Sequence, residues 1–359
     1  MLGYQRKVNH TTENFIMELE ELMQESIQIQ EKSFYASKFY YSYSSLNKLI
    51  WNPQVFYQMY VLGLKEERLD THLVQGKLIH LLLLEPEKFE KEFMVSPATL
   101  PSGNLRIVID RVYRHHVELS RNGDPREKLE EFVGAVLDVM KDMNYHQSLK
   151  TDQQRLDKIF TAEAANYWSF LKTKGSKTLI DEETFKFCSS AVDIVKTNKA
   201  VCSLIGCDVS EFDNIEVINE QMLQMDIPGK IFGLKGIIDN IVIDHDKKII
   251  YVNDIKTTSK DLKDFPESVE YYSYWLQCVV YMIMIAGLYP KLIDEDLYQV
   301  KFHFVVIDRA FQTYCFPVTE TTINKWLDRF KTVLETAEWH YVNRSYDLPY
   351  EFAKGNVVL

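Results

Sequence analysis

The chain has 359 residues, of which 46% are hydrophobic, 26% charged and 13% aromatic, and its formal net charge is −11. Abundant aliphatic and aromatic side chains exclude a disordered, collagen-like or disulfide-dense protein and provide material for a sizeable buried core. The acidic balance disfavours coating of nucleic acid or anionic membrane through bulk charge, although it is compatible with a local basic channel.

Cysteine usage and hydropathy favour a soluble intracellular protein without a membrane partner. The five cysteines form no Cys-x-x-Cys pair, so we expect buried, reduced thiols. The longest apolar stretch, Val279 to Tyr289, is far shorter than the roughly 20 residues of a membrane-spanning helix. The opening residues run into polar, acidic sequence, which is not typical of a signal peptide.

The N-terminal half is predicted to be helical. A Glu- and Gln-rich segment at 11–38 comes first, followed by a serine-capped helix that begins near Ser44. A leucine-rich helix at 69–84 is closed by Glu85-Pro86. Further helices are predicted at 127–143, 153–171 and 181–198.

The pattern changes after about residue 210 to that of strands with turns between them. Strands are predicted at 215–224, 230–244, 248–256, 299–307 and 312–318. A long apolar helix at 268–288 and a closing helix at 319–342 complete the chain. Because there is no internal repeat and no low-complexity linker, the pattern predicts one α/β domain with a largely helical N-terminal half.

The candidate catalytic residues lie in the predicted hairpin at 236–257. Apolar residues at both parities of each strand predict that both faces are covered. A turn at 245–248 would place Asp239 directly opposite Asp254. Lys256 follows two residues later, and side chains two apart share a face.

Two buried carboxylates in this arrangement need a counter-charge. At about 5 Å and an effective dielectric near 20 they repel by about 3 kcal/mol, and facing like charges destabilise a strand pair. Mg²⁺ or Mn²⁺ removes the conflict, because these ions bind oxygen ligands. With Lys256 placed to position a water or a phosphate oxygen, the set suits phosphodiester hydrolysis. The alternative is structural: an Asp254–Lys256 pair at a strand end, with Asp239 capping a turn.

Two helices carry further candidates. Gln277 and Tyr281 share a helix face at i, i+4 spacing. His80 lies in the leucine-rich helix, where it would supply a nitrogen to the same metal, and Gly76 one turn earlier permits close backbone approach. Each of these side chains also fits a satisfied core position.

Five motifs occur in chain order: Ser42-x-Ser44-x-x-x-x-Leu49 with Pro53-x-x-Phe56-x-x-x-Tyr60, then Gly76-x-x-x-His80, Gly236-x-x-Asp239, Asp254-x-Lys256-Thr257-Thr258 and Gln277-x-x-x-Tyr281. This ordered set resembles the PD-(D/E)XK nuclease superfamily, specifically its RecB-like branch and most closely the RecE-type phage and prophage exonucleases. The resemblance implies an α/β fold whose central mixed sheet is flanked by helices, a restriction-endonuclease-like core.

The resemblance also implies a domain organisation. We expect an N-terminal helical extension at 1–40, a single nuclease domain at 41–345 and a C-terminal tail at 346–359. Within the domain, a helical and Arg-rich part covers 90–205 and the catalytic sheet covers 210–318.

Roles carried over from the family fall on matching positions. The implied metal ligands are His80, Asp239, Asp254 and the carbonyl of Ile255, and Lys256 is the implied catalytic lysine. Many relatives have an additional upstream glutamate, for which Glu220 is the first candidate and Glu216 the second. Side chains implied to contact DNA or support the site are Gln277, Tyr281, Tyr274 and Ser44.

Departures from the family pattern restrict the assignment. Ile238 stands where the superfamily name has proline. Asn52 stands where iron–sulfur relatives have cysteine, and no cluster-spaced cysteines follow, so no iron–sulfur cluster is expected. No G-x-x-x-x-G-K-[ST] motif is present, which favours a stand-alone exonuclease over a helicase-fused one.

A basic cluster is the predicted contact with DNA phosphates. It comprises Arg106, Arg111, Arg114, Arg121 and Arg126, with His115 and His116. The segment Lys172-Thr-Lys174-Gly-Ser-Lys177 is a second candidate, and a solvated charged face is the alternative for both. Because RecE-type relatives are ring-shaped oligomers that digest duplex ends, the resemblance implies a homo-oligomer, cytoplasmic in a bacterial host if phage-encoded.

The leading hypothesis is a Mg²⁺- or Mn²⁺-dependent exonuclease on double-stranded DNA ends, acting 5′→3′ and leaving 3′ single strands for an annealing protein in phage-type recombination or DNA processing. One alternative is a structure-specific or single-strand DNA nuclease of the same superfamily. Another is a non-catalytic DNA-binding or assembly protein on this fold, against which the intact Asp239, Asp254 and Lys256 argue.

Overall fold

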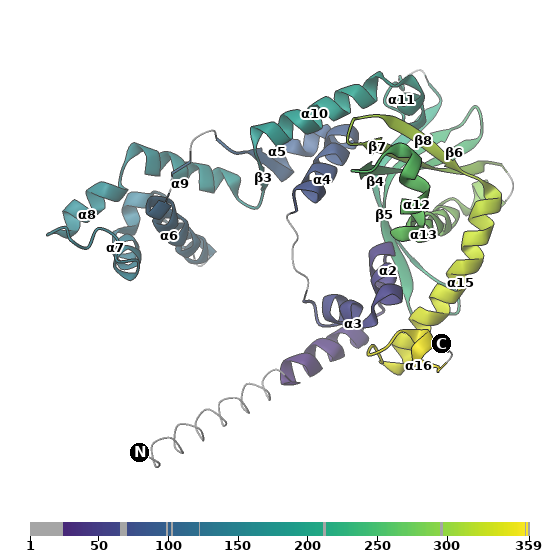
Figure 1. Ribbon diagram of the computed structural model, residues 1–359, viewed down its shortest axis with the longest axis horizontal. Coiled ribbons are helices and arrows are strands. Elements are labelled where there is room, and N and C mark those ends of the chain that lie inside the picture. Colours follow the sequence, from purple (N-terminus) through teal and green to yellow (C-terminus); the bar gives the residue numbers. More distant parts are fainter. Residues whose placement is uncertain are drawn as a thin grey trace, which may run out of the picture. The chain divides into compact units, whose positions relative to one another are not determined.

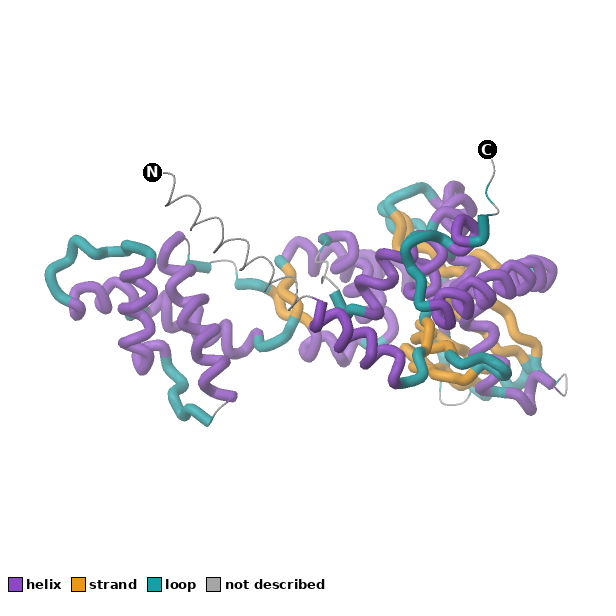
Figure 2. Tube along the Cα trace, turned by 90° about the horizontal axis from the view of Figure 1, so that it is seen from below, coloured by secondary structure: helices purple, strands orange, loops and turns teal. Residues whose placement is uncertain are grey.

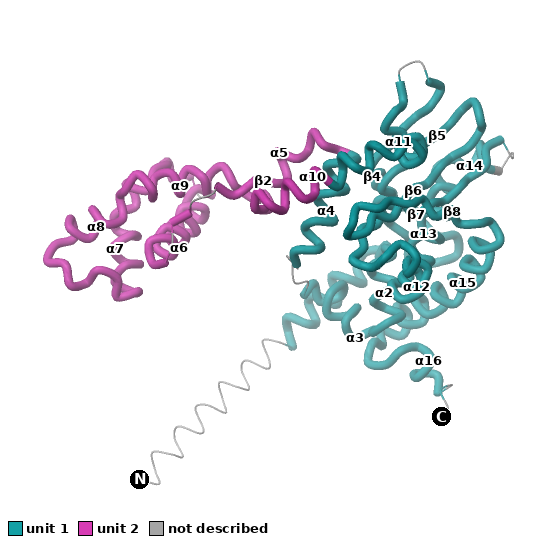
Figure 3. The backbone as a smooth tube through the Cα atoms, turned by 45° about the horizontal axis from the view of Figure 1, so that its top comes forward, with its two compact units in different colours: residues 1–84, 191–359 teal, residues 85–190 magenta. Residues whose placement is uncertain are grey.

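The computed structural model describes residues 24–64, 70–97, 100–101, 103–121, 123–210, 213–294, 297–355 and 357. They group into two compact units, which Figure 3 distinguishes by colour: unit 1 comprises Met1–Leu84 and Ala191–Leu359, and unit 2 comprises Glu85–Ser190. The predicted division into an extension at 1–40, one domain at 41–345 and a tail stays a prediction. Residues 1–23 of that extension lie outside the described residues, and 24–36 are helical.

A six-stranded mixed sheet forms the centre of unit 1 (Figure 1). Strands β4 (Ile215–Asp226), β5 (Gly233–Asp244) and β6 (Ile249–Thr258) form an antiparallel meander. After a helical crossover, β7 (Gln299–Asp308) pairs parallel with β6, and β8 (Thr313–Val318) returns antiparallel. The short β1 (Tyr40–Tyr41) pairs parallel with the start of β5. The predicted α/β class with a central mixed sheet flanked by helices is confirmed.

The predicted register of the β5–β6 hairpin is confirmed. The pairs run from Asp244–Ile249 to Asn240–Asn253, around the turn at 245–248. Pairing stops at Asn240–Asn253, so the two strands separate where Asp239 and Asp254 follow. Every residue of β5 from Ile238 to Asp244 is buried, as the apolar pattern predicted.

Helices of unit 1 pack on this sheet and bury its apolar side chains. Helix α13 (Tyr274–Leu288) contacts β4, β5 and β7 and lies between the sheet and α15 (Glu320–Asn343), with α2 (Tyr43–Trp51) beside it (Figure 1). Helices α4 (Thr71–Leu84) and α11 (Lys199–Ile205) both pack on β5 and β6. Shorter helical segments are α3 (Pro53–Phe56), η1 (Tyr57–Val61), η4 (Leu262–Asp264), α14 (Pro290–Asp294) and α16 (Tyr350–Ala353).

The single helix predicted at 268–288 is wrong, because the chain breaks into α12 (Phe265–Tyr271) and α13. Ser273, at the break, has a left-handed backbone with φ 58°. The Tyr272 carbonyl accepts hydrogen bonds from the Tyr43 hydroxyl and the Asn47 amide. Apolar periodicity continues across the break, so the sequence carried no local signal for it.

The described helices differ in length and apolar content. No single one is long and apolar enough to cross a membrane, and only the pair Leu262–Tyr271 and Tyr274–Leu288, bent by 77°, reaches that length and composition together.

Unit 2 is largely helical and has its own apolar core (Figure 2). Its helices are η2 (Pro86–Lys88), α5 (Phe89–Glu92), α6 (Gly103–Arg121), η3 (Leu129–Phe132), α7 (Val133–Asp142), α8 (Asp152–Ile159) and α9 (Ala162–Lys174), and α10 (Glu182–Thr197) continues into unit 1. A parallel pair of short strands, β2 (Phe93–Val95) and β3 (Thr178–Ile180), completes it. The helix predicted at 153–171 divides at Phe160. Arg106, Arg111, Arg114 and Arg121 of the Arg-rich stretch lie in α6, whereas Arg126 follows it.

Candidate metal centre

The imidazole of His80 has a defined orientation between α4 and β6. Its Nε2 lies 2.8 Å from the carbonyl oxygen of Ile255. Because a carbonyl only accepts, Nε2 carries the hydrogen, and Nδ1 of the neutral ring keeps its lone pair. Burial, and then the charge of Lys256, lowers the pKa of His80 to about 4, so the ring is neutral at pH 7.

Gly76 allows α4 to approach β6 this closely. A Cβ atom at this position would lie 3.1 Å from the Thr257 Oγ1, closer than ordinary van der Waals contact. The spacing Gly76-x-x-x-His80 therefore places the histidine and the smallest residue on the same side of α4, toward the same strand. The close backbone approach expected at Gly76 is present between α4 and β6.

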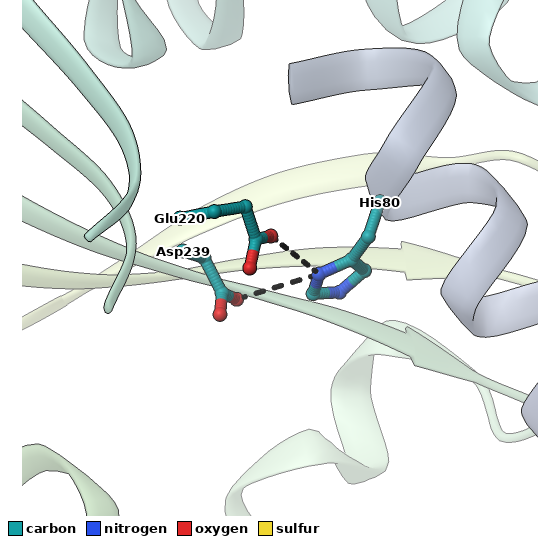
Figure 4. A group of neighbouring side chains, drawn as sticks. All are labelled: His80, Glu220 and Asp239. Atoms are coloured by element: carbon teal, nitrogen blue, oxygen red, sulfur yellow. Dashed lines mark ion pairs between the residues drawn. The ribbon is translucent and has the colours of Figure 1, made fainter. Parts of the chain in front are cut away.

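Two carboxylates point toward the free nitrogen of His80 (Figure 4). The Asp239 Oδ2 lies 3.7 Å and the Glu220 Oε1 4.0 Å from Nδ1. One ligand atom from each of the three residues lies within 4.8 Å of the others. Because Nδ1 carries no hydrogen, three electron-pair donors converge here, a set that suits a divalent cation.

Glu220 reaches this position through an unusual backbone conformation. Its φ is 48°, the left-handed region that non-glycine residues seldom adopt, at a cost of about 1–3 kcal/mol. The β4–β5 pairs Asn219–Asn240 and Gln221–Ile238 lie on either side of it, opposite Asp239. The flanking pairs hold the strained residue, and its side chain turns to the imidazole. Glu216, the second candidate, pairs with Ile243 and lies outside the group.

Asp239 lies where β5 and β6 separate. Its Oδ2 accepts a hydrogen bond of 2.7 Å from the backbone N–H of Ile255. The carboxylate thus takes the place of a strand partner beyond the last pair, because its oxygen accepts the hydrogen bond that a strand carbonyl would otherwise accept. Because β5 and β6 separate here, the Ile255 carbonyl can also accept the hydrogen bond from His80 Nε2. A ligand role for that carbonyl stays a prediction.

Asp254 is fully buried, and its Oδ2 lies 2.5 Å from the ammonium of Lys256. Among the described residues, its oxygens make no hydrogen bond of proper geometry. Burial raises the pKa of both Asp254 and Asp239, against the lowering effect of Lys256. One ammonium therefore faces more carboxylates than it can neutralise, and the donor set fits a divalent metal ion.

Lys256 remains an ammonium in this setting. Burial acts to lower its pKa, but the charges of Asp254 and Asp239 outweigh burial, so the pKa lies above its ordinary value. Its Nζ also lies 4.9 Å from the ring centre of Tyr274. The expected convergence of Asp254 with His80 and Asp239 on one ion stays a prediction, because Asp254 lies outside the group of three within 4.8 Å.

Helix α13 braces β5 next to the centre. The Gln277 amide donates to the Tyr281 hydroxyl at 2.9 Å, and that hydroxyl donates to the Ile237 carbonyl, two residues before Asp239. Both side chains are buried. A Cβ at Gly236 would lie 3.2 Å from the Tyr281 ring, so the absence of a side chain at Gly236 leaves room for this ring.

An asparagine adjoins each of the three acids in the sequence: Asn219, Asn240 and Asn253. Their amides form a ladder across β4, β5 and β6. Asn253 Nδ2 donates to Asn240 Oδ1 at 2.7 Å, and Asn240 Nδ2 donates to Asn219 Oδ1 at 2.8 Å. Asn240 and Asn253 are fully buried, so these bonds fix the order of the three strands.

The ladder also connects the sheet to two helix ends. Asn219 Nδ2 donates to the Leu84 carbonyl, at the C-terminal end of the helix that carries His80. Asn240 and Asn253 donate to the carbonyls of Ile205 and Leu204, at the end of α11. Sequence reasoning missed this ladder, although an asparagine beside each acid was a visible signal.

The remaining predicted site residues belong to helices α2 and α6. Ser44 is exposed on α2, whose N-cap is Ser42. Arg106, Arg111 and Arg114 are exposed on α6 of unit 2, where the first and third contact Asp110. Their contacts with DNA stay a prediction. The five cysteines are free thiols.

Comparison with known proteins identifies one family. The family model for the PD-(D/E)XK nuclease superfamily matches residues 40–344. Among curated proteins there is no match. Among solved structures, the chain is similar to a crystal structure from Eubacterium rectale described as "Putative exonuclease", with 14% identity, 91% of each chain covered and a TM-score of 0.43. That likeness is too distant to bear on activity.

Proposed function

Because the chain belongs to the PD-(D/E)XK nuclease superfamily, we propose that it is a divalent-metal-dependent deoxyribonuclease that hydrolyses phosphodiester bonds at the ends of double-stranded DNA. One observation carries the proposal: His80 Nδ1, Glu220 and Asp239 offer ligand atoms within 4.8 Å of one another. The ammonium of Lys256 lies beside them, paired with Asp254.

The chain's own groups have separate roles in this proposal. His80, Glu220 and Asp239 hold the cation, with Asp254 next to it. A divalent cation bound there supplies a Lewis acid for a phosphate oxygen and lowers the pKa of bound water. Lys256, kept protonated by the two aspartates, donates to a phosphate oxygen or to the attacking water. The partly exposed side of His80 and Glu220 faces the substrate.

Finer assignments rest on the resemblance of the motif set to RecE-type exonucleases. We infer that the ion is Mg²⁺ or Mn²⁺, that digestion runs 5′→3′ and that it leaves 3′ single strands for an annealing protein in phage-type recombination. A ring-shaped homo-oligomer acting in the bacterial cytoplasm is part of the same inference. The exposed arginines of α6, Arg106, Arg111 and Arg114, are the proposed contacts with DNA phosphates.

Cleavage of a linear duplex labelled at its 5′ or 3′ end, with Mg²⁺, tests this proposal. We expect mononucleotide release from the 5′ end and at least a 100-fold loss of rate in Lys256→Ala. Lys331→Ala, which removes an exposed lysine from α15, is the matched control and should cleave normally. Absence of cleavage by the native protein, or normal cleavage by Lys256→Ala, would contradict the proposal.

Two measurements distinguish the alternative functions: the preferred DNA substrate and the binding of metal. Preference for nicked circular or single-stranded DNA over linear duplex would favour the structure-specific or single-strand nuclease. Isothermal titration with Mn²⁺ addresses the non-catalytic alternative, because a protein that had lost the centre should give no binding heat at this site.

A further inference from the structure

Three tyrosines form a continuous set of rings next to the metal centre. The rings of Tyr274 and Tyr272 are nearly parallel, with centres 5.5 Å apart and an interplanar angle of 29°. Tyr271 meets Tyr272 edge-on at 4.9 Å. We call Tyr271, Tyr272 and Tyr274 the aromatic ledge. Because Lys256 Nζ lies 4.9 Å from the Tyr274 ring centre, the ledge begins at the lysine of the proposed centre.

The outer end of the aromatic ledge faces solvent. Tyr271 is 78% and Tyr272 44% exposed. Single exposed apolar residues are common on protein surfaces, but adjacent exposed aromatic rings next to a candidate site are a mark of ligand binding. Lys260 Nζ lies 5.8 Å from the Tyr271 ring centre, so an ammonium also accompanies the outer ring.

The backbone holds the aromatic ledge in place through one residue of unusual conformation and two hydrogen bonds to α2. The ledge sits at the break between α12 and α13, where Ser273 has φ 58°. The Tyr272 carbonyl accepts from the Tyr43 hydroxyl at 2.5 Å and from the Asn47 amide at 3.2 Å, both on α2. A strained residue and two long-range hydrogen bonds thus fix the exposed rings of Tyr271 and Tyr272, which indicates a functional position, whereas Tyr274 packs against Phe265 and Phe304 of the core.

Contacts with α15 fix both helices next to the break. Arg329 pairs with Glu270 of α12 at 3.0 Å, and its guanidinium stacks 3.9 Å from the ring of Trp275 in α13. The aromatic ledge is therefore preorganised rather than a loose surface loop.

We propose that the aromatic ledge binds an unpaired nucleobase of the DNA strand whose phosphate lies at the metal centre. The inference rests on the proposed function and specifies the substrate form at that site. Base–aromatic stacking tolerates every base, because each has a π-face. Ammonium groups at both ends, Lys256 and Lys260, match the phosphates that flank a stacked base. A duplex end must open by at least one pair for its base to reach the ledge.

Binding without metal tests the ledge separately from catalysis. The full chain is titrated, in EDTA, into a fluorescein-labelled single-stranded oligonucleotide. The double variant Tyr271→Ala/Tyr272→Ala should bind about 5- to 150-fold more weakly. The double variant Tyr271→Phe/Tyr272→Phe keeps the rings and should bind normally. Phe352→Ala, which removes a ring of similar exposure from α16, should also bind normally.

A cycle with an abasic nucleotide identifies the contact. Moving one abasic site along the oligonucleotide should reveal a position where the base loss weakens binding to the native protein but not to the Ala variant. Additive losses at every position, normal binding by the Ala variant, or equal weakening by the Phe variant would overturn the inference. Tyr271→Ala alone, at the most exposed ring, serves if the double variant does not fold.

The two proposals fail in distinguishable ways. Base-dependent binding without cleavage in Mg²⁺ would overturn the proposed function and leave the stacking site intact. Cleavage with binding that ignores the abasic position would overturn the stacking site alone.

Discussion

Unit 1 and unit 2 each place a histidine on an apolar helix face, His80 on α4 and His116 on α6. His116 is 6% exposed, its Nδ1 lies 3.2 Å from the Ser120 Oγ, and its ring packs against Phe132 and Trp168. His80 instead has a carbonyl at one nitrogen and two carboxylates at the other. The sequence assigned His116 to the basic cluster predicted to contact DNA, but its ring is buried in the core of unit 2. The partners of the ring nitrogens therefore decide which histidine is a candidate ligand and which is core.

The largest expected difference between the two units follows from replacing each histidine. His80→Gln removes the lone pair that faces the carboxylates, so Mn²⁺ affinity should fall by about 100-fold or more. His116→Gln should destabilise unit 2 and leave the affinity unchanged. Isothermal titration of both variants checks this. Equal affinity for Mn²⁺ in native protein and His80→Gln would contradict the ligand role of His80.

Loss of the asparagine ladder should lower Mn²⁺ affinity less than loss of a ligand, but more than loss of a buried polar pair elsewhere. Asn240→Leu removes the central amide, which should weaken Mn²⁺ binding by about 10-fold because the strands that hold Glu220, Asp239 and Asp254 lose this side-chain link and keep only their backbone pairing. The free energy of unfolding should fall by about 1–3 kcal/mol.

The control for the ladder is Asn324→Leu, at an exposed position of α15. Titration with Mn²⁺ and urea unfolding measure the two effects. A variant Asn240→Leu that loses stability but binds Mn²⁺ normally would show that the ladder acts on the fold alone.

The metal-induced gain in stability should depend on pH. Burial raises the pKa of Asp254 to about 6, above the value of an unfolded aspartate. In the metal-free protein this raised pKa favours folding at low pH, and the contribution is lost as pH rises through about 6. A cation beside Asp254 favours its charged form, so the stabilisation by Mn²⁺, about 2.7 kcal/mol at 100 times Kd, should be full above pH 7 and shrink below pH 6.

Thermal unfolding with and without Mn²⁺ between pH 5 and 8 measures this effect. His80, with its pKa lowered to about 4, stays neutral over this range and should not contribute. A metal-induced shift of equal size at pH 5 and pH 8 would contradict the account.

The smallest expected effect concerns the approach of α4 to β6. Gly76→Ala puts a methyl group 3.1 Å from Thr257 Oγ1, so α4 or the threonine must move by a few tenths of an ångström. We expect a loss of Mn²⁺ affinity below 10-fold, since only the position of His80 changes. Gly134→Ala on α7, where a Cβ meets no neighbour within 4 Å, is the control.

The sequence predicted much of this site because its signals were local. Strand periodicity and the turn at 245–248 determine the hairpin register, and helical spacing places Gln277 beside Tyr281. His80 and Asp239 were named from motifs, and Glu220 was named as the upstream acid. These are patterns within one or two elements.

What escaped prediction depends on contacts between distant segments. The break at Ser273 is fixed by Tyr43 and Asn47, more than 200 residues earlier in the chain. The separation of β5 from β6 beyond the pair Asn240–Asn253 and the left-handed backbone of Glu220 depend on how three strands pair. Glu220 joins His80 and Asp239 in the group of three through that left-handed backbone, and no spacing rule encodes it.

A crystal grown with Mn²⁺ tests the central claim most directly, because anomalous scattering locates the ion independently of activity. The account predicts one ion within bonding distance of His80 Nδ1, Glu220 and Asp239, with Lys256 alongside. An imidazole turned away from both carboxylates, or an ion held elsewhere in the chain, would contradict it.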